Sequence, residues 1–238
     1  MATPAPGCPR ANARAIPGAV TPRAAFEILA KITAYLRQPD RRTLAILGEG
    51  GTGKSALMAK ALAEAEQNYP QRAIVYRFIG ATAASSDGRS LLESLCREIS
   101  RCYGTDQSNI PLDYRDLVPE FSKRLALATA EKPLVLFLDS LDQLSASQGA
   151  RSLSWLPGEL PEHVSVIVST RGGEMDTSKN LRGKQVSEAV LEGLELSEGK
   201  ELLGAWLANV QRRLKPDQEQ AVLDTATELT ETAQEYWE

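Results

Sequence analysis

The sequence has 238 residues, of which 42% are hydrophobic, 24% charged and 5% aromatic, and its formal net charge is −4. These values are ordinary for a globular protein of one good-sized domain, and they exclude a collagen-like, a disulfide-stapled or a wholly disordered chain. The longest apolar runs have only about five residues, far fewer than the roughly 20 of a membrane-spanning helix, so no membrane association is expected. Three cysteines form a low, odd count that favours a reducing compartment, and we expect a cytoplasmic protein.

Residues 1–20 are rich in proline, alanine and glycine and lack an apolar period, which predicts a disordered tail. The lack of acidic residues there resembles an organelle transit peptide, but the prolines oppose the amphipathic helix of such peptides. Order is expected to begin at Thr21, whose hydroxyl group would cap a helix with Pro22 at its first position. Apolar residues then recur at helical spacing and predict one buried face: Ala25, Ile28, Leu29, Ile32 and Leu36.

Short apolar runs alternate with helical patterns along the rest of the chain. Strands are predicted at residues 43–47, 73–78, 133–138 and 164–169, with a candidate fifth strand at residues 185–191. Helices are predicted at residues 54–67, 90–103, 117–130, 197–210 and 217–235. Because the strand runs are continuously apolar, they fit a parallel sheet covered by helices on both faces. The predicted fold class is therefore α/β, a three-layer αβα sandwich around a parallel sheet of about five strands.

The strongest chemical signal is a glycine-rich segment between the first predicted strand and the helix after it. Its sequence GEGGTGKS matches the GxxxxGK[ST] pattern of phosphate-binding loops, in the strand-then-helix context that the motif requires. Glycines permit close approach of the backbone, and main-chain N–H groups at the start of the helix line a hollow for an anion. Lys54 would bring its charge to the terminal phosphates, and the Ser55 hydroxyl group would ligate Mg²⁺. The residues predicted to bind nucleotide are Gly48, Glu49, Gly50, Gly51, Thr52, Gly53, Lys54, Ser55 and Ala56.

Acidic residues follow the most apolar predicted strand, in the segment LVLFLDSLDQL. A carboxylate directly after a buried strand is costly unless it faces a polar crevice, which in open α/β sheets lies at the carboxyl ends of the strands. We therefore predict that Asp139 is the carboxylate on the Mg²⁺ side of a bound nucleotide. Asp142 would either position the attacking water or cap the next helix, and Arg171 would either reach the γ-phosphate or belong to a surface turn. The candidate catalytic residues are Lys54, Asp142 and Arg171.

The order of the predicted strands narrows the class of phosphate-loop protein. One strand lies in sequence between the phosphate-loop strand and the strand of Asp139, and another strand follows. This arrangement resembles the branch of P-loop NTPases that inserts a strand between those two in space, as AAA+ and STAND ATPases do. The guanine-reading Asn/Thr-Lys-x-Asp signature of small GTPases and the ABC-type signature are absent from the sequence. Adenine is therefore the expected base, and ATP or ADP with Mg²⁺ is the expected cofactor.

Beyond the single motifs, residues 21–206 resemble NACHT-type STAND NTPases, in particular those whose NTPase module accompanies WD or TPR repeats, such as nephrocystin-like and telomerase-associated proteins. GEGGTGKSAL is similar to the phosphate loop of that family, LVLFLDSLDQL to its acidic motif and SWLPGELPEHVSVIVSTR to its sensor strand. The chain departs from the family at Gln143, where many relatives carry a further acid. It also departs at TPRAAF, which replaces the usual Gly-Arg-Glu entry, so the adenine contacts are not identified.

The resemblance implies an ATP-dependent switch, in which nucleotide exchange or slow hydrolysis controls oligomerisation or partner binding. Carried over by position, it makes Lys54 and Ser55 the phosphate and Mg²⁺ residues, Asp139 the Mg²⁺ residue, Asp142 the second acid and Arg171 the sensor arginine.

The resemblance also implies a division of the chain into an NTPase core at residues 21–196 and the start of a helical lid at residues 197–238. A winged-helix segment, repeats and an effector domain would lie outside this chain, which would then be a fragment. The expected partners are a nucleotide and, through such repeats, other proteins or further copies; nucleic acid is not expected. Two other functions stay open, a P-loop kinase acting on a small molecule or nucleotide and an inactive scaffold. Origin-recognition-type AAA+ ATPases share most core motifs, but no DNA-binding appendage is visible in the sequence.

Overall fold

The computed structural model describes residues 22–38, 40–173 and 176–223. Five strands form one sheet in the order β2-β3-β4-β1-β5, and every neighbouring pair is parallel. The strands are β1 (Leu44–Gly48), β2 (Ala73–Phe78), β3 (Leu134–Asp139), β4 (Val164–Arg171) and β5 (Ser187–Val190). The α-helices are α1 (Arg23–Arg37), α2 (Lys54–Asn68), α3 (Gly88–Tyr103), α4 (Tyr114–Leu125), α5 (Asp176–Arg182) and α6 (Leu196–Asn209). Short 3₁₀ helices are η1 (Ala83–Ser86), η2 (Leu141–Gln143) and η3 (Ser147–Ser152).

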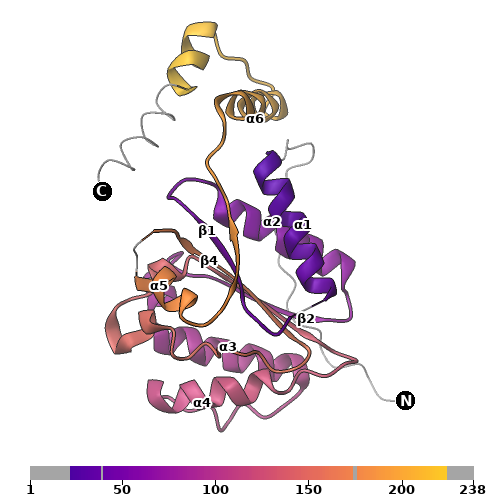
Figure 1. Ribbon diagram of the computed structural model, residues 1–238, viewed down its shortest axis with the longest axis vertical. Helices are drawn as coiled ribbons and strands as arrows, with labels where there is room; N and C mark the ends of the chain where they lie inside the picture. Colours follow the sequence, from indigo (N-terminus) through magenta and orange to yellow (C-terminus); the bar gives the residue numbers. More distant parts are fainter. Residues whose placement is uncertain (1–21, 39, 174–175, 224–238) are drawn as a thin grey trace.

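Helices cover both faces of the sheet, which confirms the predicted sandwich. Figure 1 shows α1 and α2 on one side of the sheet and α3 and α4 on the other. The side chains of each strand alternate between the two layers. In β3, Val135 and Phe137 pack in the cluster formed with α1 and α2, whereas Leu136 packs with α3 and α4. Asp139, two residues after Phe137, therefore belongs to the face that α2 covers.

The inserted strand β4 lies between β1 and β3 in space, although it follows both in sequence. Its register places Gly48 of β1 beside Arg171 and Leu138 of β3 beside Val168. The carboxyl ends of the three strands consequently meet at one edge of the sheet, where the loops after them come together. The strand order expected for an AAA+ or STAND ATPase is confirmed.

The fourth helix begins earlier than its apolar pattern predicts. The side chain of Asp113 accepts the backbone N–H of Arg115 at 2.8 Å and caps α4, so the helix starts at Tyr114 and not at residue 117. It ends at Leu125, because the following turn tightens to bonds over three residues. The helix at the N-terminal end also differs by one residue: Pro22 occupies the capping position of α1, not its first helical position. Thr21 and the predicted tail at residues 1–20 lie outside the described residues.

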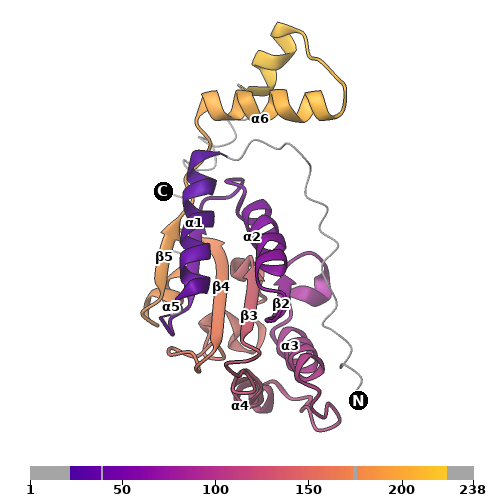
Figure 2. The same cartoon turned by 90° about the vertical axis from the view of Figure 1, so that its right-hand side faces the viewer.

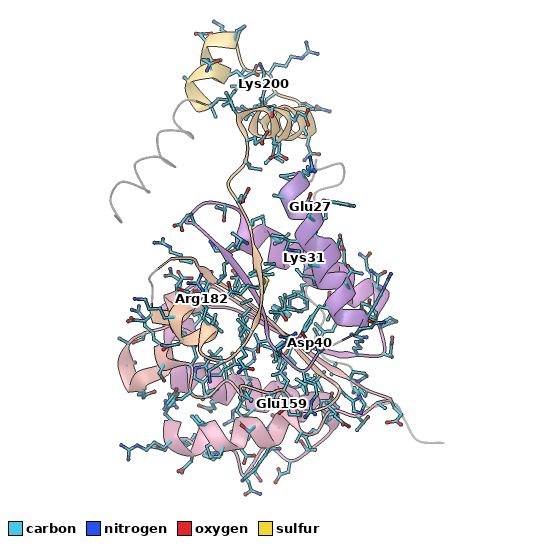
Figure 3. The ribbon with its side chains drawn as sticks, viewed as in Figure 1. Glu27, Lys31, Asp40, Glu159, Arg182 and Lys200 are labelled. Atoms are coloured by element: carbon cyan, nitrogen blue, oxygen red, sulfur yellow. The ribbon has the colours of Figure 1, made fainter. Side chains whose placement is uncertain are left out.

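A helical segment follows the sheet. The chain leaves β5 in an extended stretch and reaches α6 beyond one end of α1 and α2 (Figure 2), and residues 216–223 form a further helix. Lys200 of α6, labelled in Figure 3, pairs with Glu219 of that helix at 3.5 Å. Glu198 of α6 accepts the backbone N–H of Arg23 at 2.9 Å and so joins α6 to the first turn of α1. None of the helices in the described ranges has the length and hydrophobicity that crossing a bilayer demands.

Replacing Phe121 by alanine should destabilise the fold strongly. The Phe121 side chain is fully buried in α4 and meets the ring of Trp155 edge to face, with ring centroids 5.8 Å apart. A cavity of this kind typically costs about 3–5 kcal/mol, so Phe121→Ala should lower the free energy of unfolding by that amount in a denaturant titration. The control is Phe26→Ala on α1, where the side chain is 66% exposed and a change below about 0.5 kcal/mol is expected. Equal losses in the two variants would contradict the described core.

Candidate functional site

The loop between β1 and α2 has the backbone shape of an anion cradle. Gly51 and Gly53 have φ angles of 84° and 90°, a left-handed region that favours glycine, and Gly53 is the capping residue of α2. A Cβ atom on Gly53 would meet no atom within 4 Å, so the loop opens onto free space at that point. A Cβ atom on Gly48 would lie 2.5 Å from the carbonyl oxygen of Leu191, so only glycine fits where the chain after β5 passes the loop.

Backbone donors at the start of α2 are available to a ligand. The first hydrogen bond into this helix runs from the N–H of Leu57 to the carbonyl of Gly53 at 2.9 Å. The N–H groups of Lys54, Ser55 and Ala56 have no acceptor within the part of the chain that the structure describes. Such a row of unpaired donors, at the positive end of a helix dipole, favours binding of a phosphate or another anion.

Lys54 is held against the loop itself. Its Nζ donates to the carbonyl oxygens of Gly48 and Glu49, both at 2.6 Å, and the residue is only 9% exposed. Burial lowers the pKa of Lys54, and the nearby carboxylates of Asp142 and Glu49 oppose that effect. The two carbonyl acceptors are neutral, so an anionic ligand would be a stronger partner for this ammonium group.

Asp139 lies at the tip of β3 and is 3% exposed. Its Oδ1 accepts the hydroxyl group of Ser169 at 2.5 Å, and its Oδ2 accepts the hydroxyl group of Ser140 at 3.2 Å. These hydrogen bonds compensate for burial of the charge. Because a carboxylate has about four acceptor positions, Asp139 keeps capacity for a further partner.

Asp142 and Arg171 form a second polar group beside the loop. Asp142 Oδ1 accepts the backbone N–H of Arg171 at 3.2 Å, and its Oδ2 accepts the side-chain amide of Gln143 at 3.0 Å. The Arg171 Nε lies 3.8 Å from Asp142 Oδ2. A Cβ atom on Gly50 would come within 3.4 Å of the Arg171 Nη2, so the guanidinium group faces the phosphate loop. Asp142 therefore caps no helix among the described residues.

The predicted residues meet in one place, at the carboxyl ends of β1, β3 and β4. Asp142, Arg171 and Asp139 all lie close enough to Lys54 to shift the pKa of its ammonium group. Ser55 and Ala56 lie exposed in the first turn of α2. Within the loop, Thr52 donates its hydroxyl group to the carbonyl of Glu49 at 3.0 Å.

Ser169 is a polar residue of the site that the sequence did not single out. It ends the predicted strand VSVIVS, where a serine is unremarkable, and its contact with Asp139 spans 30 residues. Its position two residues before Arg171, on the same face of β4, is the one signal available once the strand order is known.

The donor set fits a polyphosphate that carries its own metal ion. No group of three or more histidine, cysteine, aspartate or glutamate residues in the described ranges is arranged to hold a metal ion. Mg²⁺ is commonly held by one or two carboxylates together with phosphate oxygens and water, and not by a cage of protein ligands. Asp139 and the Ser55 hydroxyl group supply oxygen atoms of that kind, and the N–H groups of the loop with Lys54 supply the matching donors for phosphate.

Comparisons with known proteins agree with this geometry. The sequence profile of the AAA ATPase domain matches residues 26–169. The human NACHT and WD repeat domain-containing protein 2 is 34% identical over 146 residues, which are 58% of this chain and 8% of that protein. The human NACHT domain- and WD repeat-containing protein 1 is 31% identical over 201 residues, which are 80% of this chain and 13% of that protein. The chain thus corresponds to a small part of either relative.

A solved structure shares the fold. The Aeropyrum pernix ORC1 protein, in a complex with DNA, superposes with a TM-score of 0.60 over 91% of this chain and 58% of that chain, at 17% identity. At that identity the likeness concerns the arrangement of helices and strands.

Proposed function

Because the chain belongs to the AAA ATPase domain family and is a NACHT-type P-loop NTPase domain, we propose that it is the ATP-dependent module of a molecular switch. It binds ATP together with Mg²⁺, hydrolyses ATP slowly and thereby controls assembly with protein partners or with further copies. The observation that carries this proposal is the convergence of Lys54, Asp139 and Asp142 at one edge of the sheet, beside unpaired backbone donors.

Each residue of the site has a role in this proposal. Lys54 exchanges its two carbonyl acceptors for phosphate oxygens, and the N–H groups at the start of α2 bind the same anion. Asp139 and Ser55 hold Mg²⁺, which supplies charge neutralisation next to the phosphates when it is bound. Asp142 orients the attacking water and accepts its proton, and the Arg171 guanidinium group stabilises charge on the transferred phosphoryl group.

The switch role and the partners rest on the relatives. The names of both human relatives include WD repeats, which lie outside the aligned segment, and repeat domains commonly present binding surfaces to other proteins. We propose that this module, the core at residues 21–196 with the helical segment after it, acts on such partners in the cytoplasm. We expect no binding to nucleic acid, because the sequence contains no concentrated basic stretch, and the likeness to the DNA-bound ORC1 protein concerns the fold.

The proposal is tested by titrating ATP into the purified chain with and without Mg²⁺. Wild-type protein should bind ATP more tightly with Mg²⁺ than without it, and Asp139→Asn should lose that gain while its metal-free affinity is retained, because the variant keeps the shape but not the charge of the metal-side oxygen. The matched control is Asp116→Asn in the exposed first turn of α4, which should behave as wild type. A chain that binds no ATP, or an Asp139→Asn variant with the full gain from Mg²⁺, would contradict the proposal.

The same preparation separates hydrolysis from the two other functions. Release of phosphate into water supports the switch, transfer to an added small molecule or nucleotide supports a kinase, and binding without turnover supports a scaffold.

A further inference from the structure

The hydroxyl group of Ser169 is the deepest polar group of the site. Ser169 is 0% exposed and lies on β4, the strand inserted between β1 and β3, on the face that includes Asp139. A hydroxyl group in a buried sheet costs free energy unless its hydrogen bonds are made. A small apolar residue could occupy the same volume, so the hydroxyl group of Ser169 needs an explanation other than packing.

The direction of the hydrogen bonds at Ser169 is defined by its neighbours. The backbone N–H of Ser140 donates to the Ser169 Oγ at 2.8 Å, which leaves the hydroxyl hydrogen for Asp139 Oδ1 at 2.5 Å. Ser140 has a φ angle of 61°, which is uncommon for a residue other than glycine, and this turn of the backbone directs its N–H toward β4. The relay therefore runs in one direction, from the Ser140 amide through Ser169 to the carboxylate.

The relay distinguishes the two oxygens of the carboxylate. Oδ1 is engaged by a buried donor that cannot turn to solvent, whereas Oδ2 accepts the hydroxyl group of Ser140 at 3.2 Å, a longer and less buried contact. We propose that Ser169 is a positioning residue that orients the Asp139 carboxylate and directs Oδ2 toward Mg²⁺. This inference rests on the proposed function, since it assigns Ser169 to the same metal side of the site.

The chain offers a matched control on the same strand. Ser165 lies four residues before Ser169, on the same face of β4, and is 3% exposed. Its hydroxyl group bonds the Tyr35 side chain at the other end of the strand. Ser165→Ala therefore removes a buried hydroxyl group from the same strand without touching Asp139.

The test compares the Mg²⁺ dependence of ATP binding in wild type, Ser169→Ala, Ser165→Ala, Asp139→Asn and the double variant Ser169→Ala with Asp139→Asn. Loss of a hydrogen bond that orients a metal-binding carboxylate typically costs 10- to 100-fold in metal affinity. We expect Ser169→Ala to raise the Mg²⁺ concentration for half-maximal effect by about 10- to 100-fold, with unchanged affinity for ATP in the absence of metal. Ser165→Ala should leave both values unchanged. Adding Ser169→Ala to Asp139→Asn should cause no further change, because the serine acts through the carboxylate.

An unchanged Mg²⁺ requirement in Ser169→Ala would overturn the inference, as would an equal loss of metal-free ATP binding or a full additional effect in the double variant. If Ser169→Ala does not fold, Ser169→Cys decides: this variant keeps a side chain of similar shape with a weaker donor, and it should also raise the Mg²⁺ requirement. A normal requirement in Ser169→Cys would overturn the inference in that case. Failure of the proposed function looks different, because wild-type protein itself would then show no Mg²⁺-dependent binding.

Discussion

The Asp142→Asn variant is expected to bind ATP with nearly wild-type affinity and to hydrolyse it about 100 to 10,000 times more slowly, the usual contribution of a positioned general base. The amide keeps the contacts of one carboxylate oxygen, so the backbone N–H of Arg171 retains its acceptor. What is lost is the negative charge that would accept a proton from water. The measurement is phosphate release under single-turnover conditions, which separates the chemical step from nucleotide exchange.

Two comparisons make the Asp142→Asn result specific. Asp116→Asn, in the exposed first turn of α4, should hydrolyse ATP at the wild-type rate. Asp142→Asn should also unfold at about the wild-type denaturant concentration, because the hydrogen bonds at its Oδ1 are retained. A variant that hydrolyses ATP normally would remove Asp142 from the catalytic residues.

The Lys54→Ala variant is expected to lose about 10- to 100-fold in ATP affinity, with or without Mg²⁺. The buried ammonium group now donates to two neutral carbonyls, at 2.6 Å each, and is available to a charged ligand. One hydrogen bond to a charged group contributes about 1.5–3 kcal/mol, and about 1.4 kcal/mol corresponds to a factor of ten. Equilibrium binding of ATP, measured by calorimetry, gives the loss directly.

The control for Lys54→Ala is Lys31→Ala. Lys31 lies exposed on α1, the helix beside α2 (Figure 3), and its removal changes the net charge by the same amount. Equal losses of ATP affinity in both variants would show an effect of overall charge and would exclude a specific role for Lys54. A loss that appears only with Mg²⁺ would assign Lys54 to the metal side of the site.

Sequence patterns predict the parts of the site that lie within one local segment. The phosphate loop is a contiguous motif, and Asp139 directly follows a run of buried residues, so both can be found without knowing the fold. The parallel sheet is predictable for the same reason, since continuous apolar runs mark strands covered on both faces. The position of β4 between β1 and β3 follows only from resemblance to NTPases of this class.

Contacts between distant segments are not predictable in this way. Ser169 and Asp139 are 30 residues apart, and Arg171 and Asp142 are 29 apart, so neither pair leaves a periodic signal. The left-handed turn at Ser140 is equally hidden, because serine has no marked preference for that conformation. The start of α4 was predicted wrongly because its capping residue Asp113 precedes the apolar positions, and the pattern places Pro119 near the helix start instead of inside the helix.

The width of one strand has a consequence for selectivity. Neighbouring strands run about 4.8 Å apart, so with β4 between them the tips of β1 and β3 are separated by about 9.6 Å. Lys54 is consequently satisfied by carbonyls of its own loop and not by Asp139. A free polyanion can satisfy only the cationic half of this gap, and a free dication only the anionic half. The site therefore works as a coincidence detector, which responds fully only when metal and nucleotide arrive as one bipolar unit.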